Sequence, residues 1–330
     1  MKLENKLYPL RFETIFKDKI WGGEKIKTIL GKDFSPLPNC GETWEISGVK
    51  GNISVVQNGA LAGLSLVELI DQYGARLVGE KVYKKFGAEF PLLVKFIDAN
   101  DDLSIQVHPD DSLAKTRHNS FGKTEMWYIL QADEGAGLIT GFNRPLNKET
   151  YLEYFESGRI MEILNRETAH IGDVFFLPAG RVHTIGKGLL LAEIQQTSDI
   201  TYRIYDFDRR DDQGNLRDLH VEESLDAIDY KFYDSYKTQY VSKENEAVNV
   251  VSCPYFSTQR ISGDKPMRRD YRDKDSFVIY ICVAGSLVFT DNNGNETRLS
   301  RGEACLIPAE IQSVDLSPET HYTLLEAWVP

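Results

Sequence analysis

The segment Ser104–Asp111, SIQVHPDD, places an amide and an imidazole two positions apart between apolar residues. Side chains two apart on a β-strand share a face, so Gln106 and His108 are expected to point the same way. Asp110 and Asp111 are expected to close a turn after the proline. Because amide oxygen and imidazole nitrogen both bind divalent metal ions, this segment is the first candidate for a metal site.

Two further side chains of ligand type follow at a distance. Glu125 begins the strand-like run EMWYIL, and His183 ends the segment GDVFFLPAGRVH. Strands that are distant in sequence lie side by side in a β-sandwich, so these residues can converge with Gln106 and His108 on one cavity. Oxygen and imidazole ligands without a thiolate suit Zn²⁺, and also Fe²⁺ or Mn²⁺. Such a site can keep a coordination position open for water or substrate.

The elements that must position these residues are mostly short strands broken by Gly and Pro, which is typical of a sandwich or barrel. Helical spacing occurs in LSLVELIDQYGARLVGEKVYKKF, with an interruption near Gly74, and in NKETYLEYFESGRIMEIL, with Asn147 as N-cap. The segment VEESLDAIDY is expected to form a short helix. A polar stretch suggests a boundary near residues 235–245. We therefore expect a mainly β protein with two domains, residues 1–240 and 241–330.

An internal repeat supports the two domains. The segment GDVFFLPAGRVH is echoed by GEACLIPAEIQS, in which Gly302 and Pro308 keep their positions and Ser313 stands in the place of His183. The second copy lacks the ligand-type residues of the first. We expect it to retain an apolar scaffold and no metal site.

Composition excludes several classes of partner. The chain has 330 residues with 38 Lys and Arg, 50 Asp and Glu, and a formal net charge of −12, which argues against nucleic acid and anionic membranes. Neither a signal peptide nor an apolar run of about 20 residues is evident. The scattered cysteines Cys40, Cys253, Cys282 and Cys305 fit a reducing cytoplasm rather than a disulfide framework.

Four motifs in order carry a family resemblance: SIQVHPDD, FGKTEMWYIL, GDVFFLPAGRVHTIGKG and QQTSDITYRIYDFDR. From Trp21 to about Asp229, and more weakly beyond, the chain resembles the type I phosphomannose isomerases in their short bacterial form. The resemblance implies two cupin (jelly-roll) domains with a few added helices: a catalytic cupin domain, residues 1–240, and a cupin-like domain without metal ligands, residues 241–330. It also implies zinc-dependent interconversion of mannose 6-phosphate and fructose 6-phosphate. The large helical insertion of the longer eukaryotic forms is missing.

The same resemblance assigns roles to individual residues. It implies one zinc ion per chain, with Gln106 as the looser of the ligands Gln106, His108, Glu125 and His183. It makes Arg203, in SDITYR, the active-site arginine. Lys123, in GKTE, and Glu193 are implied to line the same pocket.

The chemistry of such an isomerase explains why these residue types are needed. A proton must leave one carbon and return to its neighbour through a cis-enediol, whose oxygens carry developing negative charge. A metal ion and the guanidinium of Arg203 can stabilise that charge. For general acid–base catalysis, Lys123, with a pKa expected to be lowered by the metal, competes with Glu193 and a metal-bound hydroxide. The sequence does not choose among them.

The substrate phosphate also needs cations or hydrogen-bond donors. Candidates near the motifs are Lys95, Ser104, Lys187 and Arg181. No particular one is favoured by its spacing. The partner is then a small sugar phosphate, and the sequence leaves monomer and homodimer open.

Two other functions compete with the isomerase. One is a different metal-dependent cupin, such as an Fe-dependent oxygenase or a cupin-type sugar-phosphate isomerase of other specificity. Those cupins have a tighter His-x-His pair with a nearby glutamate, whereas His108 and Glu125 here are seventeen positions apart. The other is a non-catalytic sugar-phosphate-binding cupin, against which the retention of Lys123 and Arg203 counts.

Overall fold

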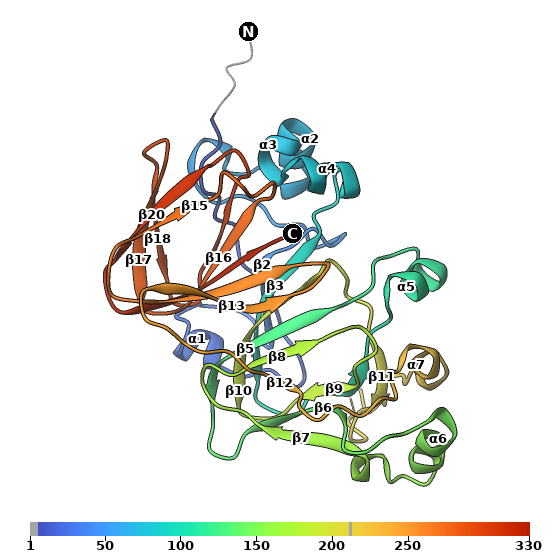
Figure 1. The fold of residues 1–330 in the computed structure, drawn as a ribbon. Coiled ribbons are helices and arrows are strands. Elements are labelled where there is room, and N and C mark those ends of the chain that lie inside the picture. Colours follow the sequence, from blue (N-terminus) through green and yellow to red (C-terminus); the bar gives the residue numbers. More distant parts are fainter. Residues whose placement is uncertain (1–5, 211–212) are drawn as a thin grey trace. The chain divides into compact units, whose positions relative to one another are not determined.

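The computed structural model describes residues 6–210 and 213–330 (Figure 1). The chain forms two compact units that alternate along the sequence. Unit 1 comprises residues 1–15, 44–94 and 239–330, and unit 2 comprises residues 16–43 and 95–238. The division into catalytic and C-terminal domains at residue 240 stays a prediction. Within the described ranges, no helix is both long and apolar enough to cross a membrane.

Two sheets, which belong largely to unit 2, carry or flank every candidate site residue. The larger sheet has the order β1 (Ile15–Lys17), β2 (Glu42–Ile46), β3 (Leu92–Ala99), β10 (Leu189–Gln196), β5 (Glu125–Ala132), β8 (Val174–Leu177) and β12 (Lys237–Thr238). The smaller sheet has the order β11 (Tyr202–Tyr205), β4 (Ile105–Val107), β9 (His183–Ile185), β6 (Gly137–Phe142) and β7 (Leu164–Thr168). The residues of β5 and β10 are β-branched, aromatic or long apolar side chains for the most part, which favours buried strands.

Unit 1 also contains two sheets. One has the order β13 (Glu246–Ser252), β14 (Ser257–Gly263), β21 (Tyr322–Trp328), β16 (Val278–Ala284) and β19 (Ala304–Ile307). The other has the order β15 (Met267–Asp270), β20 (Ser313–Pro318), β17 (Ser286–Asp291) and β18 (Glu296–Ser300).

The strand order of unit 1 repeats that of unit 2. The run β10-β5-β8 corresponds to β21-β16-β19, and the run β4-β9-β6-β7 corresponds to β15-β20-β17-β18. The internal repeat in the sequence therefore reflects a repeated arrangement of strands. The expectation of a mainly β fold with a few helices is confirmed.

Helices are few and short. Unit 2 has α1 (Lys25–Thr28), α5 (Asp111–His118), α6 (Lys148–Glu156), α7 (Val221–Ala227) and the 3₁₀ helix η2 (Ile160–Glu162). Unit 1 has η1 (Gly59–Leu61), α2 (Leu66–Tyr73), α3 (Ala75–Val78) and α4 (Glu80–Phe86). In Figure 1, α5, α6 and α7 lie on the same side of unit 2.

The expected helices form where the sequence predicted them. The first is divided at Gly74, whose φ of 51° is left-handed, and begins with a reciprocal cap between Ser65 and Glu68. The second begins at Asn147, whose side chain accepts a hydrogen bond from the backbone N–H of Thr150. It ends earlier than its spacing suggests, because Gly158 has a φ of 71° and starts a new turn.

The expectation that Asp110 and Asp111 only close a turn was wrong, because Asp110 caps the N-terminus of α5 through the N–H of Leu113. His118 is the last residue of this helix. Only Ala114 of α5 is buried, so the segment has no apolar period by which a helix could be predicted.

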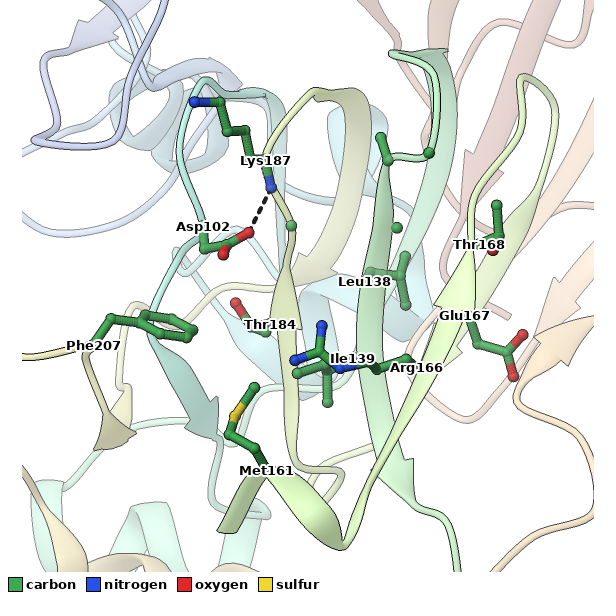
Figure 2. A pocket seen from close by; sticks show the side chains of 14 residues that line it. Asp102, Leu138, Ile139, Met161, Arg166, Glu167, Thr168, Thr184, Lys187 and Phe207 are labelled. Atoms are coloured by element: carbon green, nitrogen blue, oxygen red, sulfur yellow. Dashed lines mark hydrogen bonds between the residues drawn. The ribbon is translucent and has the colours of Figure 1, made fainter. Parts of the chain in front are cut away.

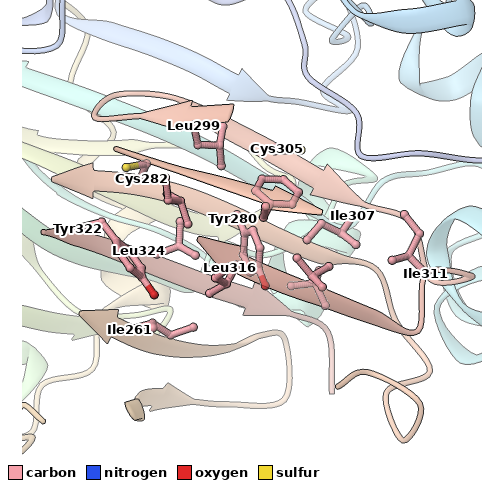
Figure 3. Packing of buried hydrophobic residues seen from close by; sticks show 14 of the residues in the cluster. Ile261, Tyr280, Cys282, Leu299, Cys305, Ile307, Ile311, Leu316, Tyr322 and Leu324 are labelled. Carbon is pink, nitrogen blue, oxygen red and sulfur yellow. The ribbon is translucent and has the colours of Figure 1, made fainter. Parts of the chain in front are cut away.

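The core of unit 1 combines aliphatic and aromatic side chains of both of its sheets (Figure 3). Cys282 and Cys305 are fully buried members of this core, and all four cysteines of the chain are free. These buried thiols therefore serve as small apolar side chains.

The interior of unit 1 is not purely apolar, which corrects the expectation for the second repeat. Glu326 on β21 is fully buried and accepts hydrogen bonds from Arg269 Nε at 2.8 Å and Tyr271 Oη at 3.0 Å. It lies opposite Tyr280 in the ladder, just as Glu193 lies opposite Trp127 in unit 2. The repeat therefore keeps a buried glutamate at the equivalent position, with an arginine as its partner.

Candidate metal centre

A row of directly paired residues crosses the smaller sheet of unit 2. Arg203 on β11 pairs with Gln106 on β4, Gln106 pairs with His183 on β9, and His183 pairs with Thr140 on β6. Residues directly opposite one another in antiparallel strands have side chains on the same face. Strand register therefore brings an arginine, an amide, an imidazole and a hydroxyl into one line.

The structure brings the predicted ligand residues together. His108, Glu125 and His183 are buried, and their potential ligand atoms all lie within 4.8 Å of one another. His183 Nε2 is 3.2 Å from Glu125 Oε1, and His108 Nε2 is 3.6 Å from Glu125 Oε2. Gln106 Nε2 is 3.3 Å from His183 Nε2, and a half-turn of this amide places Oε1 at the same point.

This geometry fits a tetrahedral divalent ion. Ligand atoms about 2.1 Å from zinc at tetrahedral angles lie about 3.4 Å apart, which matches the separations in the cluster. Glu125 is fully buried; Lys123 Nζ lies 2.9 Å from its Oε2, while its Oε1 has no hydrogen-bond partner among the described residues. A buried carboxylate is costly unless cations bind it, so the oxygen that Lys123 does not contact remains available to a metal ion.

Backbone carbonyls orient both imidazoles. His108 Nδ1 donates to Ile200 O at 2.8 Å, and His183 Nδ1 donates to Arg181 O at 2.8 Å. These hydrogen bonds leave each Nε2 as the lone-pair nitrogen that faces the cluster. Burial lowers the pKa of His183 to about 3 and that of His108 well below its ordinary value, with the nearby Lys123 lowering it further. Both rings are therefore neutral, as metal ligands must be.

Buried charges of alternating sign surround the cluster. Lys123 Nζ is 2.9 Å from Glu125 Oε2, and Lys95 Nζ is 3.2 Å from Glu193 Oε1 and 3.9 Å from Glu42 Oε2. Trp127 Nε1 donates to Glu193 Oε2 at 2.8 Å. These contacts form two groups in unit 2, Lys123 with Glu125 and Lys95 with Glu193 and Glu42, and the carboxylates of the second group also act on the charge of Lys123.

The pKa shifts follow from these contacts. Burial alone would lower the pKa of Lys123, but the carboxylates of Glu125 and Glu193 raise it above its ordinary value. The lowered pKa expected from the sequence assumes a bound metal ion. Burial raises the pKa of Glu125, whereas Lys95 and Lys123 outweigh burial at Glu193 and lower its pKa.

Arg203 lies at the more open end of the row. Its guanidinium donates from Nη1 to Asp218 O at 2.7 Å, and its buried Nε has no hydrogen-bond partner among the described residues. Two further arginines, Arg209 and Arg217, both bind Asp206 nearby and, after burial, help to lower the pKa of Arg203. This end of the row is therefore rich in positive charge.

The four candidates for phosphate binding lie in different surroundings. Lys95 belongs to one of the two buried charge groups, and Ser104 is buried two residues before Gln106 on the same side of the chain. Arg181 is buried against the rings of Tyr233 and Tyr236, at 4.4 and 4.7 Å from their centroids.

Lys187 lines a different pocket, of about 410 Å³ (Figure 2). Its backbone N–H donates to Asp102 Oδ1 at 2.8 Å, while its amine points away from the middle of this pocket. Thr184, which follows His183 on β9, also lines it. Successive strand residues face opposite sides of a sheet, so this pocket and the cluster are on opposite faces of β9.

Some residues that contribute to the site could not be predicted from the sequence. Glu42 reaches the charge group of Lys95 because β2 and β3 are neighbours, and it belongs to no motif. The carbonyl that orients His108 belongs to Ile200, a residue whose side chain is irrelevant to this contact. Asp111 accepts hydrogen bonds from Gln196 Nε2 and the N–H of Gly122, and no hydrogen bond among the described residues joins it to His108.

Comparison with known proteins connects this geometry to an activity. Residues 10–135 match the family model of the phosphomannose isomerase type I catalytic domain, and residues 246–323 match that of the mannose-6-phosphate isomerase cupin domain. A mannose-6-phosphate isomerase of Streptococcus mutans is 39% identical over 308 residues, which cover 92% of this chain and 94% of that protein. A mannose-6-phosphate isomerase of Bacillus subtilis is 38% identical over 269 residues, or 79% of this chain and 82% of that protein.

A solved structure agrees with these relatives. The crystal structure of the mannose 6-phosphate isomerase from Bacillus subtilis superimposes with a TM-score of 0.86 and 31% identity. It covers 97% of this chain and 99% of that chain. The similarity therefore extends over both units.

Proposed function

The chain belongs to the type I phosphomannose isomerases, enzymes that isomerise mannose 6-phosphate, and from this premise we propose a zinc-dependent mechanism through a cis-enediol(ate). The proposed reaction interconverts mannose 6-phosphate and fructose 6-phosphate. The observation that carries the zinc proposal is the buried cluster of His108, Glu125 and His183, in which Glu125 Oε1 has no hydrogen-bond partner among the described residues. The relatives argue against an oxygenase and against a non-catalytic binder.

We propose that Gln106, His108, Glu125 and His183 hold one zinc ion per chain. A divalent ion at this position supplies positive charge that polarises the carbonyl and hydroxyl oxygens at C1 and C2 of the sugar. The carbonyls of Ile200 and Arg181 keep both imidazoles in the orientation this requires. Gln106 is the neutral and weaker member of the set.

Lys123 is the best-supported group for proton transfer. Its Nζ lies within 3.2 Å of a proposed ligand, so it can reach a carbon whose oxygens face the cluster. With a divalent ion in the cluster, the amine would be neutral and could take the proton from C2 of the aldose and return it to C1, while the hydroxyl proton of O2 passes to O1; the reverse reaction uses the same positions. Glu193 is engaged by Lys95 and Trp127, which favours an electrostatic role for it.

Arg203 has the properties needed to stabilise the enediolate. It shares a face with Gln106 and His183, remains protonated, and has a buried Nε–H without a partner. For the phosphate, the positive charge of Arg209 and Arg217 beyond Arg203 is favoured over the predicted Lys95 and Ser104, since Lys95 pairs with Glu193. Lys187 and Arg181 lie in other surroundings. The four free cysteines support the expected cytoplasmic location.

An assay with and without metal tests this proposal. The purified protein should contain about one zinc ion per chain, lose mannose 6-phosphate isomerisation on treatment with a chelator, and regain it when Zn²⁺ is added. Metal content is measured by mass spectrometry on the same samples. Full activity in protein shown to be metal-free would exclude the zinc mechanism.

Isotope transfer tests the enediol separately. Mannose 6-phosphate carrying deuterium at C2 should yield fructose 6-phosphate with part of the deuterium exchanged for solvent hydrogen, because the proton resides on Lys123 between the two steps. Complete retention of deuterium at C1 over many turnovers, seen by NMR, would instead indicate direct hydride transfer. Fe²⁺ and Mn²⁺ in parallel show whether the metal preference is specific to zinc.

A further inference from the structure

Thr140 is a hydroxyl-bearing residue in the row of the metal centre that the sequence did not single out. It pairs with His183 in the β6–β9 ladder, on the side of His183 away from Gln106 and Arg203. It is completely buried. Its place at the closed end of the row follows from strand register alone.

The hydroxyl of Thr140 has no hydrogen-bond partner among the described residues. Its neighbour His183 cannot provide one, because Nδ1 donates to Arg181 O and Nε2 faces Glu125. A buried polar group without a partner costs stability, whereas valine has nearly the same shape without this cost. The hydroxyl therefore needs a hydrogen-bond partner that is not part of the chain.

The direction of the substrate along the row follows from charge. Arg203, Arg209 and Arg217 gather at one end with Asp206 as the carboxylate that pairs with two of them. A dianionic phosphate is stabilised beyond Arg203, next to Arg209 and Arg217, whereas Thr140 at the opposite end is fully buried. The sugar carbon furthest from the phosphate, C1, then points toward Thr140.

We propose that the Thr140 hydroxyl hydrogen-bonds O1 of the substrate, and that Thr140 is thus a catalytic residue of the isomerase. The hydroxyl can both donate and accept, so it suits O1 as the aldehyde oxygen of the aldose and as the hydroxyl of the ketose. The inference rests on the proposed function, since it takes the cluster as the place where C1 and C2 react. No described residue hydrogen-bonds this hydroxyl.

Three variants test the hydroxyl. Thr140→Val should lower kcat/KM for mannose 6-phosphate about 10- to 100-fold while zinc content stays at the wild-type level. Thr140→Ser, which keeps the hydroxyl, should stay close to wild type. The matched control is Thr258→Val, because Thr258 is also a fully buried strand residue with a partnerless hydroxyl, but lies in unit 1.

Thermal stability distinguishes a hydroxyl that binds substrate from one that only stabilises the fold. Both valine variants should raise the thermal midpoint of the substrate-free protein by a few degrees, since each removes an unsatisfied group. Only Thr140→Val should lose activity as it gains stability. A fall in midpoint, or loss of zinc, in Thr140→Val would make its hydroxyl structural and overturn the proposal.

Two inhibitors identify the contacted atom. Mannitol 6-phosphate keeps C1 and its hydroxyl, whereas arabinitol 5-phosphate corresponds to the substrate without C1. Thr140→Val should weaken inhibition by the first about tenfold and leave inhibition by the second unchanged. An equal change for both, or no change for either, contradicts the contact with O1. If the wild-type protein isomerises mannose 6-phosphate and binds zinc, and Thr140→Val has the same activity, this inference alone is refuted. If the wild-type protein is inactive, the proposed function is refuted.

Discussion

Lys123 Nζ lies 2.9 Å from Glu125 Oε2 and 3.2 Å from His108 Nε2, so a protonated amine sits at the edge of the candidate metal centre. The amine neutralises part of the charge that a metal ion would otherwise neutralise. Lys123 therefore has two roles: it stabilises the metal-free cluster and, with metal present, it is the proposed proton carrier.

Replacing Lys123 by methionine tests both roles. Without metal, the variant leaves Glu125 buried beside no cation, and its free energy of unfolding should fall by about 3–5 kcal/mol. With zinc bound the loss should be smaller, because the ion takes over the carboxylate. With zinc bound, turnover should fall about 10²- to 10⁴-fold, as expected for a lost general acid–base group. Denaturant unfolding with and without zinc, together with the coupled assay, measures both quantities; equal destabilisation in the two conditions would contradict the first role.

Arg203→Ala should reduce kcat about 10²- to 10³-fold while zinc content stays near the wild-type value, because the guanidinium stabilises the enediolate and is no ligand. Arg166→Ala is the control, since Arg166 lines the pocket on the other face of the sheet. Its kcat should equal that of wild type. If Arg203→Ala lost its zinc instead, its role would be structural.

Asp98 predicts a pH dependence of stability. It is fully buried, and burial raises its pKa to about 6 despite a hydrogen bond of 2.7 Å from the Lys25 N–H. Because the folded protein binds this proton more tightly than the unfolded chain does, the contribution of Asp98 to the free energy of unfolding falls as pH rises from about 4 to 6, by up to about 3 kcal/mol. The free energy of unfolding of Asp98→Asn should therefore increase relative to that of wild type as pH rises across this range, as measured by unfolding at several pH values.

Asp33→Asn supplies the opposite sign as a control. The hydrogen bonds from Ser35 and Lys27 lower the pKa of the Asp33 carboxyl. Its contribution to stability is therefore present at neutral pH and is lost as pH falls below its ordinary range. A flat difference between Asp98→Asn and wild type would show that Asp98 is ionised in the folded protein at the same pH as in the unfolded chain.

The buried network of unit 1 predicts a stability effect without a catalytic one. Arg269→Met leaves Glu326 buried without its cation and should lower the free energy of unfolding by about 3–5 kcal/mol. Zinc content and kcat below the melting range should not change. Arg268→Ala, which removes an exposed pair with Asp315, should hardly affect stability. Loss of turnover at low temperature in Arg269→Met would contradict a purely structural role.

The ligand residues could be predicted because their residue types and their local spacing indicate metal ligands. Gln106 and His108 share a strand face by their spacing, and His183 ends a distinctive Gly-Pro-Gly turn. The three segments converge because β4 and β9 are hydrogen-bonded neighbours and β5 supplies Glu125. Residue types and motif order were sufficient for this much of the site.

The remaining features depend on strand register and tertiary contacts, which single segments do not encode. Thr140 stands in LITGF like any strand threonine, and only the β6–β9 ladder places it beside His183. Arg269 and Glu326 are far apart in sequence and meet only inside the folded unit. Helix α5 escaped prediction because its polar sequence buries one alanine and relies on a cap.

The alternation of the two units along the chain has a consequence for synthesis on the ribosome. The last residue of unit 2 is 238, so all residues of the metal centre have been translated before the segment 239–330 of unit 1. Helices α2–α4 emerge early, yet Leu77 and Val78 accept hydrogen bonds from Ala309 and Phe277, which are translated near the end. During elongation the apolar faces of these helices therefore stay uncovered until the C-terminal segment has been translated. A chain that ends at residue 240 would contain every proposed zinc ligand, but its uncovered helix faces would be exposed to chaperones.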